Sequence, residues 1–541
     1  MKSLHAVGLM LVVWSFIYLS FLGERELRGE EARRIIPAQE MIEDDQWVVT
    51  TIAGEHYGNK PPLINWIIAG SFLLTGSESE WAARLPSVLS FLLLALAVFF
   101  TFRERLGVKR AVSISLVLLT AGSLIEKYRM AEIEGIFITL FGFACLSWIA
   151  LWTAHRSPWL LWTVPYLFIG FGCLAKGPVH LLFWVLFLFS ILRWARSMRD
   201  LFHPAHLLGL LIMAAIPLPW VLSNLGAAAT PDDSVDNWIQ EITKRADFSP
   251  EALKGWATHP LEMLINFLPW TIPLIFSLWC LRKNGKPNLP LSKWDAVIRG
   301  SFWSAAFSAL ALLTIPGGLP RYLLPLYVPA SVALVGLYFQ VDERRRHGYE
   351  LFVYYSLLIL SGIATLLLLG ALFYSVREGL QPLWGWVILS LGCLAGFLIW
   401  LVRKKTSPGV FFSTPIAIAI AFLFLSSVAI PFEREEYQFR SGASEIQDLA
   451  AEVEGIRVFY ADSKFRNIYP KHLRLIYYLG DQFVAQGESK TLPEDTEFLI
   501  GRTGSEPAMR ELIGNRTIER SAALEIDGLP FTAFYLSGRP D

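Results

Sequence analysis

Residues 134–153 read EGIFITLFGFACLSWIALWT, and this stretch indicates the class of protein to which the chain belongs. Glu134, at its start, is the only charged residue in it. A helix needs roughly 20 mostly apolar residues to cross the hydrocarbon core of a bilayer. The stretch is therefore long enough to form one membrane span, and it places a carboxylate where that span begins.

Apolar runs of similar length recur along most of the chain, and they number about thirteen. They lie near residues 5–22, 83–101, 110–125, 134–153, 158–175, 177–195, 206–223, 262–281, 298–315, 321–340, 351–374, 382–402 and 410–431. A shorter apolar stretch at 61–75 is expected to lie along the membrane interface or to re-enter rather than to cross. The sequence therefore predicts a polytopic α-helical membrane protein.

The composition agrees with this class. Only 17% of the 541 residues are charged, whereas a soluble domain typically has about 25%. Basic and acidic residues number 47 each, so the net charge indicates no nucleic-acid partner. The four cysteines all fall inside apolar runs, which predicts no disulfide framework. No small-residue cleavage site follows the first apolar run, so we interpret it as an uncleaved span rather than a signal peptide.

Positively charged residues gather in alternate loops, which predicts the orientation of the chain. Cytoplasmic loops of membrane proteins carry an excess of lysine and arginine. A cytoplasmic N-terminus and about thirteen crossings place every basic cluster on the cytoplasmic side. These clusters are Arg103/Arg105/Lys109/Arg110, Arg193/Arg196/Arg199, Arg282/Lys283/Lys286, Arg344/Arg345/Arg346 and Arg403/Lys404/Lys405.

The chain changes character after residue 432, where charged residues become frequent again. Short runs typical of strands occur there, with two helical stretches between them. The strand-like runs are Ile456–Tyr460, Leu473–Tyr478, Phe498–Ile500 and Phe531–Leu536, and the helical stretches are Gly442–Glu454 and Glu506–Leu512. We expect a transmembrane domain over 1–432, with its first external loop at 23–82, and an external α/β domain over 433–541.

The first external loop contains the densest group of candidate functional residues. Glu30, Glu31 and Arg33 follow the first span closely, and Lys60 precedes Pro61-Pro62 at the start of an apolar stretch. Exposed acids are ordinary on a solvated surface, so a purely structural interpretation of the glutamates stays open. A lysine held at the interface by rigid prolines is able to bind a lipid phosphate.

A second group of charged residues lies at the predicted external ends of later spans. Glu134 begins a span and has Arg129 as a candidate partner, and an ionisable residue at such a depth suggests function. Glu134 also suits a structural role, because an acid at a helix N-terminus is favoured by the helix dipole. Lys176 lies between two apolar runs. Arg321 and Tyr322 suit phosphate or sugar binding. They are equally explained if their long side chains only extend to the membrane interface to keep their polar ends in water.

The orientation predicted from the basic loops places all these residues on the external side of the membrane. None of them was used to predict that orientation. Carboxylates combined with several cations imply an anionic substrate and a reaction step that needs a base. Because carboxylates are present, a divalent metal is possible. No ligand is assigned to it, because no ligand spacing stands out.

The order of these motifs resembles that of the bacterial GT-C fold glycosyltransferases of family 39/83, which include the 4-amino-4-deoxy-L-arabinose lipid A transferases and the protein O-mannosyltransferase superfamily. That family has Asp-Glu-x-Arg-Tyr, Glu-Met, Gly-Asp-Trp, Tyr-x-x-Lys-Pro-Pro and Arg-Leu-Pro in its first loop. The corresponding residues here are Glu30-Glu31-Ala32-Arg33-Arg34, Glu40-Met41, Asp45-Gln46-Trp47, Tyr57-Gly58-Asn59-Lys60-Pro61-Pro62 and Arg84-Leu85-Pro86. Later landmarks are Arg129-x-Ala131-x-x-Glu134, Lys176-Gly177-Pro178, Phe267-Leu268-Pro269-Trp270 and Leu319-Pro320-Arg321-Tyr322-Leu323-Leu324-Pro325.

The resemblance implies an inner-membrane enzyme that moves a sugar from a polyprenyl-phosphate donor to a lipid, glycan or protein acceptor at the periplasmic face. It implies that Glu30 is the general base, that Arg33 and Lys60 bind the donor phosphate, and that Tyr57 and Tyr322 line the same site. Four of the departures from the family bear on the candidate site. Glutamates stand at 30 and 134 where the family usually has aspartates, Arg34 replaces a tyrosine, and Asn59 replaces an acid.

The sequence thus predicts a glycosyltransferase that acts by general-base catalysis with inversion. Glu30, Glu134 and Glu31 are its candidate catalytic residues, with Glu31 as an alternative base. Its candidate substrate-binding residues are Arg33, Tyr57, Lys60, Arg129, Lys176, Arg321 and Tyr322. Two alternatives stay open: a transporter or flippase of lipid-linked sugars, and an inactive homologue that binds them.

Overall fold

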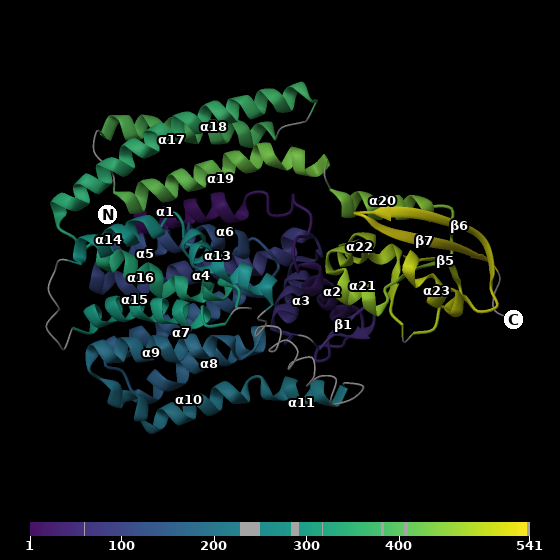
Figure 1. The fold of residues 1–541 in the computed structure, drawn as a ribbon, viewed down its shortest axis with the longest axis horizontal. Helices are drawn as coiled ribbons and strands as arrows, with labels where there is room; N and C mark the ends of the chain where they lie inside the picture. The colour runs from purple at the N-terminus through teal and green to yellow at the C-terminus, as the bar shows by residue number, and fades with distance from the viewer. Residues whose placement is uncertain are drawn as a thin grey trace. The chain divides into compact units, whose positions relative to one another are not determined.

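The computed structural model describes residues 1–58, 60–227, 249–282, 292–315, 318–379, 383–404, 409–435, 437–488 and 490–537 (Figure 1). Most of the segment between the predicted spans at 206–223 and 262–281 lies outside these ranges, and so do the basic residues Lys283, Lys286 and Lys405. Contacts within the chain define two compact units. The helical unit comprises Met1–Leu22, Pro86–Leu222 and Thr230–Pro431, and the α/β unit comprises Gly23–Leu85, Ser223–Ala229 and Phe432–Asp541.

The helical unit consists of long apolar helices, as the sequence predicts. Within the described residues, nine helices are long and apolar enough to cross a membrane, or up to eleven if each of two bent pairs is one span. The nine are α4 (Glu80–Leu106), α7 (Ile133–Thr153), α8 (Pro158–Lys176), α9 (Leu181–Ala195) with its preceding turn, α10 (Pro204–Ala215) with α11 (Leu218–Ala227), η5 (Pro320–Leu326) with α16 (Tyr327–Tyr338), α17 (Glu343–Arg377), α18 (Trp384–Lys404) and α19 (Val410–Glu435). The polytopic class is confirmed, whereas the count of thirteen spans stays a prediction.

Two runs that the sequence predicts as continuous spans are broken in the structure. The run at 110–125 divides into α5 (Val108–Leu119) and α6 (Gly122–Tyr128), bent by 65°. The run at 262–281 divides between α13 (Pro250–Asn266) and α14 (Thr271–Leu281), bent by 91°. Pro269 lies in the second break, where its missing N–H ends the helical hydrogen bonding. The two breaks are in contact, because the Gly122 N–H donates to the Leu268 carbonyl at 3.0 Å.

The remaining helices of this unit are shorter or more polar. The predicted span at 5–22 corresponds to α1 (Ser3–Trp14) followed by a π-helical turn, η1 (Ser15–Leu19). Together the two are short for a membrane span. The predicted span at 298–315 lies in α15 (Lys293–Leu312), which packs tightly on α9. A side chain at Gly300 would come within 2.6 Å of the Ile191 Cα, so the absent side chain allows this approach.

Figure 1 shows α17, α18 and α19 side by side along one face of the helical unit. They share a small apolar core of their own, made by Tyr354, Leu394, Phe397, Leu401 and Ile420. The main core is larger and is rich in aromatic side chains, which supply much buried area per residue. Its largest fully buried members include Trp148, Trp162, Trp184 and Trp270.

The α/β unit contains a five-stranded mixed sheet with the order β4-β3-β5-β7-β6. Its strands are β3 (Ile456–Tyr460), β4 (Val484–Gln486), β5 (Thr496–Arg502), β6 (Thr517–Ile526) and β7 (Leu529–Ser537). β3 pairs in parallel with β4 and β5, and β7 pairs antiparallel with β5 and β6. Its helices are α20 (Gln438–Leu449), which runs along β6 and β7 in Figure 1, α21 (Ser463–Ile468), α22 (Arg474–Leu479) and α23 (Glu506–Ile513).

One predicted strand is wrong. The run Leu473–Tyr478 forms the end of a 3-10 turn and most of α22. Leu475 and Leu479 are both buried, and residues four apart share one face of a helix, whereas a strand would alternate. A short apolar run of this kind does not distinguish helix from strand by its pattern alone.

The first external loop also belongs to the α/β unit. It forms α2 (Ala32–Glu43), a two-stranded hairpin of β1 (Thr51–Ile52) and β2 (Glu55–His56), and α3 (Leu63–Thr75). With 13 residues, α3 is shorter than a membrane span requires.

Candidate functional site

The ten side chains that the sequence predicts for the site fall into two groups of five, one in each unit. The α/β unit contains Glu30, Glu31, Arg33, Tyr57 and Lys60. The helical unit contains Arg129, Glu134, Lys176, Arg321 and Tyr322.

Glu30 and Arg33 form an ion pair at the start of α2. Arg33 Nη1 lies 3.0 Å from Glu30 Oε2, and the Glu30 side chain is 41% exposed. Arg33 Nη2 donates to the carbonyls of Arg466 at 3.2 Å and Asn467 at 3.4 Å, in the last turn of α21. The last carbonyls of a helix have no partner within it, and they attract cations. The guanidinium of Arg33 is therefore fixed between an exposed carboxylate and a helix C-terminus.

Asp462 caps the other end of α21. Its Oδ1 accepts the Phe465 N–H at 2.6 Å, and its Oδ2 accepts Arg502 Nη2 at 2.7 Å and the Ser505 hydroxyl. Burial opposes the charged carboxylate, but the hydrogen bonds from Ser505, Arg502 and the Phe465 N–H outweigh it and lower the pKa of Asp462. The helix whose carbonyls hold Arg33 is thus anchored at both ends.

Glu31 lies next to Glu30 in sequence but in a different environment. Its side chain is 0% exposed, and both of its oxygens accept hydrogen bonds from Arg84, at 2.8 and 2.9 Å. Its Oε2 also accepts the Arg28 N–H at 2.7 Å. Two neighbouring glutamates therefore differ sharply in their access to solvent.

Tyr57 follows the hairpin, and Glu40 of α2 holds that hairpin. The Glu40 carboxylate accepts the Ala53 N–H at 2.6 Å, the Thr51 hydroxyl at 2.5 Å and the Gly54 N–H at 3.3 Å. Burial is the main cause that raises the pKa of Glu40, although these three hydrogen bonds act in the opposite direction. The Tyr57 N–H donates to the Thr50 carbonyl at 2.8 Å, which ties the residue to the base of the hairpin.

The end of this loop carries the predicted phosphate-binding lysine. The Tyr57 hydroxyl lies 3.5 Å from Nη1 of Arg34, a buried residue of α2. Lys60 is partly exposed and comes directly before the prolines that lead into α3. Asn59, at which the sequence departs from the family motif, lies outside the described residues.

In the helical unit, Glu134 and Lys176 form a partly buried ion pair. Lys176 Nζ, at the end of α8, lies 2.8 Å from Glu134 Oε1 in the first turn of α7, and both side chains are about one-eighth exposed, at 12% and 13%. The Lys176 ammonium also lies over the rings of Tyr322 at 5.0 Å and Phe137 at 5.4 Å. The positive charges of Lys176, Arg321 and Lys127 all act on the Glu134 carboxylate.

Arg129 has partners that sequence reasoning did not identify. Its guanidinium donates to the carbonyls of Ile17 and of Ser20, the latter at 2.8 Å, and lies 4.7 Å from the centre of the Phe422 ring. Sequence reasoning named Arg129 as the partner of Glu134, and the structure gives Glu134 an ion pair with Lys176. Lys176 is 42 positions from Glu134, so only the packing of α7 against α8 reveals this pair.

Sequence reasoning also missed two residues that support the first loop, Arg84 and Glu40. Both lie within motifs that carry the family resemblance, Arg84-Leu85-Pro86 and Glu40-Met41, and this was the signal that could have identified them. In the part of the chain that the structure describes, no three His, Cys, Asp or Glu side chains gather closely enough to hold a metal ion.

Comparisons with known proteins agree with the motifs. Residues 59–222 match the model of the dolichyl-phosphate-mannose-protein mannosyltransferase family. The chain is 27% identical over 339 residues to undecaprenyl phosphate-alpha-4-amino-4-deoxy-L-arabinose arabinosyl transferase 2 of Pseudomonas fluorescens, covering 61% of this chain and 55% of that one. It is 27% identical over 389 residues to the corresponding transferase of Pseudomonas aeruginosa strain LESB58, covering 70% and 67%. The matched region thus spans little more than half of the P. fluorescens relative.

The fold matches over nearly the whole chain. The crystal structure of ArnT from Cupriavidus metallidurans bound to undecaprenyl phosphate aligns with a TM-score of 0.67 and 18% identity, over 98% of this chain and 97% of that one. The apo structure of the same protein aligns with a TM-score of 0.66.

The fold is the GT-C fold, and the apolar helices are those of a multi-pass membrane protein. Within that class the chain is ArnT-like in both sequence and fold, as its motifs predict.

Proposed function

We propose that the protein is a glycosyltransferase that moves a sugar from an undecaprenyl-phosphate carrier to an acceptor at the periplasmic face of the inner membrane. The observation that carries this proposal is the pair at the start of α2: an exposed carboxylate, Glu30, beside a guanidinium, Arg33, that is fixed by the end of α21. A base at this place can accept the proton of the acceptor hydroxyl. A cation beside it can stabilise the negative charge on the leaving phosphate. The relatives described above are named for undecaprenyl-phosphate sugar transfer, which supports this donor class.

The reaction proceeds by direct displacement. The acceptor hydroxyl oxygen attacks the anomeric carbon, and its proton passes to the Glu30 carboxylate. The bond between the anomeric carbon and the phosphate oxygen breaks, and its electron pair leaves on the phosphate. Arg33 and Lys60 stabilise the charge that grows there. Attack on the face opposite the leaving phosphate inverts the anomeric configuration.

The remaining predicted residues are assigned supporting roles. Tyr57 lines the donor site from the base of the hairpin. In the helical unit, Lys176, Arg321, Tyr322 and Arg129 provide a cationic and aromatic lining of the kind that binds phosphate and sugar. Glu134 compensates the charge of Lys176 within that lining. Glu31 is buried in a bidentate pair, so we assign the role of base to Glu30.

The proposed acceptor is a lipid, a glycan or a protein. Glutamate at positions 30 and 134, in place of aspartate, lengthens each carboxylate arm by one methylene, or roughly 1 Å. Because small displacements of a base matter, we propose that the donor sugar or the acceptor differs from that of the 4-amino-4-deoxy-L-arabinose transferases. We also propose a cytoplasmic N-terminus, a transmembrane domain over 1–432 and a periplasmic domain over 433–541.

The test is the substitution Glu30→Gln, which keeps the size of the side chain and removes its basicity. The full-length protein is purified in detergent and supplied with undecaprenyl-phosphate-linked sugars and an extract of bacterial membrane lipids, and release of undecaprenyl phosphate is measured. Turnover should fall by about 100-fold or more. Glu78→Gln, an exposed acid in the same loop, is the matched control and should keep wild-type turnover. Wild-type turnover in Glu30→Gln would contradict the role of Glu30. Absence of turnover in the wild-type protein, with uptake into vesicles instead, would favour a transporter.

A further inference from the structure

Arg84 is the residue around which the start of the first loop is folded. It lies in the second turn of α4, and its side chain is 4% exposed. Its Nε and Nη2 bind the two carboxylate oxygens of Glu31 at 2.8 and 2.9 Å. Nη1 donates to the Arg25 carbonyl and Nη2 to the Glu26 carbonyl, both at 3.0 Å. One guanidinium thus contacts both ends of the segment 25–31.

The same segment is closed by hydrogen bonds of its own. The Arg28 N–H donates to Glu31 Oε2 at 2.7 Å, and the Glu31 N–H donates to the Arg28 carbonyl at 3.1 Å. Gly29 has a φ of 53°, in the left-handed region that glycine adopts at little cost, so the chain reverses there. Glu30 follows that reversal, and its direction is set by a turn whose ends are both held by Arg84.

We propose that Arg84, acting through Glu31, is the positioning residue that aims Glu30 and Arg33 at the donor. This inference rests on the function proposed above and deepens it. Glu31 is the residue directly before α2, so a shift of its carboxylate moves the preceding Glu30 and the first turn that carries Arg33. The two adjacent glutamates then have different roles: the buried Glu31 holds the turn, and the more exposed Glu30 reacts.

The geometry requires arginine rather than any cation. A guanidinium presents its N–H groups in a rigid planar fork that matches a carboxylate, and it has further donors for carbonyls. A lysine ammonium at position 84 keeps the positive charge, but it is a compact group that does not reproduce the fork. Arg84→Lys therefore separates the loss of positioning from the loss of charge.

The experiment compares wild-type protein, Arg84→Lys and Glu31→Gln as full-length chains in detergent. Three quantities are measured for each: the melting temperature, the affinity for undecaprenyl phosphate, and the kcat for release of undecaprenyl phosphate from a sugar-linked donor. Arg103→Lys is the matched control, because Arg103 lies on the same helix and pairs loosely with the exposed Glu104, at 3.7 Å.

Both test variants should lose at least about tenfold in kcat, because a small misplacement of a base costs that much or more. Their melting temperatures should also fall, because each substitution weakens a buried ion pair, so kcat is compared per folded molecule at a temperature at which each variant stays folded. Arg103→Lys should match wild type throughout. A double variant adds a readout that a merely structural role would not move. Glu31→Gln should reduce turnover by a smaller factor when Glu30→Gln is already present, since part of its effect acts through Glu30.

Several outcomes would overturn the inference. An unchanged kcat in Arg84→Lys would overturn it. A decrease in activity that is fully accounted for by a smaller amount of folded protein would also overturn it. Equal effects of Glu31→Gln with and without Glu30→Gln would also overturn it. If Arg84→Lys does not fold, Glu31→Gln alone decides by the same criteria. If the wild-type protein neither binds undecaprenyl phosphate nor releases it, the proposed function fails, and this inference falls with it.

Discussion

The ion pair between Glu134 and Lys176 makes a prediction at the scale of the single residue. Both side chains are about one-eighth exposed, at 12% and 13%, so each charge depends on the other in a region of low dielectric. Removing Lys176 takes away the ion-pair partner of Glu134 and leaves only the positive charges of Arg321 and Lys127 acting on it. The loss of one partner of a buried pair typically costs about 3–5 kcal/mol. We therefore expect Lys176→Met to lower the free energy of unfolding by roughly this amount. Denaturant unfolding of the purified protein in mixed micelles measures it.

The double variant Glu134→Gln/Lys176→Met is the control for that interpretation. With both charges removed, no uncompensated group is left, and most of the lost stability should return. If the two single losses simply add in the double variant, the pair is not the source of the stability.

Asp462 makes a prediction about pH, also at the scale of the residue. Burial opposes its charged form, but hydrogen bonds from Ser505 and Arg502 prevail and lower its pKa in the folded protein. The unfolded chain therefore binds this proton at a higher pH than the folded chain does. The stability that the carboxylate contributes is fully present above the ordinary aspartate pKa of about 3.9, and it is lost as the pH falls through the lowered value.

The test is Asp462→Asn, followed by urea unfolding with a fluorophore attached to the thiol that Glu519→Cys introduces on β6. At pH 7 the variant should be less stable by about 1–3 kcal/mol, because it weakens charged hydrogen bonds to Arg502 and Ser505. The difference from the protein with Asp462 intact and the same label should shrink below about pH 4. A difference that stays constant between about pH 7 and about pH 3 would contradict the argument.

At the scale of the element, Glu40 should control the hairpin that leads to Tyr57 and Lys60. Its carboxylate binds three groups of the hairpin formed by β1 and β2, and Glu40→Ala leaves those donors without this acceptor. Hydrogen exchange of the amides at 51–56 should become faster, and undecaprenyl phosphate should bind more weakly, by about tenfold for a loss of roughly 1.4 kcal/mol. Gln39→Ala is the control, because Gln39 lies on the same helix and donates to the exposed Glu78. Unchanged amide exchange in Glu40→Ala would contradict this role.

The helices could be predicted well wherever an apolar run was long and uninterrupted. The spans at 134–153 and 158–175 correspond closely to α7 (Ile133–Thr153) and α8 (Pro158–Lys176), because uninterrupted apolar length is an unambiguous signal. The breaks between α5 and α6 and between α13 and α14 could not be read in the same way. Hydropathy does not change at a bend, and Pro269 is one of several prolines that lie inside apolar runs.

The strands of the small sheet show the same limit. β3 was predicted with its observed bounds, Ile456–Tyr460, because this short run rich in β-branched and aromatic residues follows Gly455 and ends shortly before Asp462. β6 (Thr517–Ile526) was missed, since it is an edge strand in which most side chains are exposed and no apolar run marks it. The predicted strand at Leu473–Tyr478 failed for the opposite reason: an apolar run was present, and it was helical.

The candidate site was predictable in its residue types but not in its pairings. Glu30, Arg33 and Lys60 could be chosen from charge, position and motif, and their roles stay predictions. The ion pair of Glu134 with Lys176 and the hydrogen bonds of Arg33 to α21 join residues 42 and more than 400 positions apart. No local pattern encodes such contacts, because they depend on how whole elements pack.

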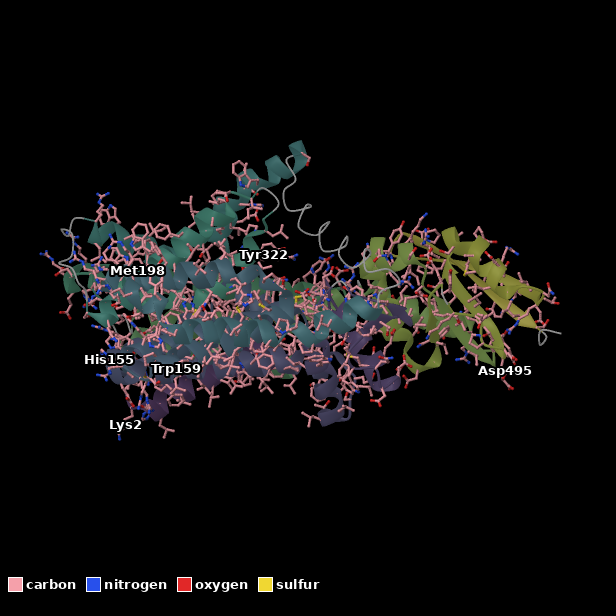
Figure 2. All side chains as sticks on the ribbon, turned by 90° about the horizontal axis from the view of Figure 1, so that it is seen from below. Lys2, His155, Trp159, Met198, Tyr322 and Asp495 are labelled. Atoms are coloured by element: carbon pink, nitrogen blue, oxygen red, sulfur yellow. The ribbon has the colours of Figure 1, made fainter. Side chains whose placement is uncertain are left out.

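At the scale of the molecule, the labelled residues of the helical unit separate along its length. Figure 2 shows Lys2, His155 and Met198 near one end of this unit, and Tyr322 lies well away from that end. The charge pattern assigns the first three residues to the cytoplasmic side, and it places Tyr322 at the external end of a span. Within this unit, these residues predicted for opposite sides of the membrane therefore lie apart along its length.

The orientation that follows is a prediction for the whole molecule: basic loops in the cytoplasm, and the sheet of the α/β unit in the periplasm. Two single-cysteine variants test it, Glu343→Cys at the start of α17 and Glu519→Cys on β6, both exposed positions. In cells with a permeabilised outer membrane, a membrane-impermeant maleimide should label position 519 and not position 343. Position 343 should react only after the inner membrane is opened. The native cysteines lie within α7, α8, α14 and α18, and the unsubstituted protein measures their background. Reversed labelling would place Glu30 and Arg33 away from a periplasmic acceptor, and a cytoplasmic acceptor would have to be sought instead.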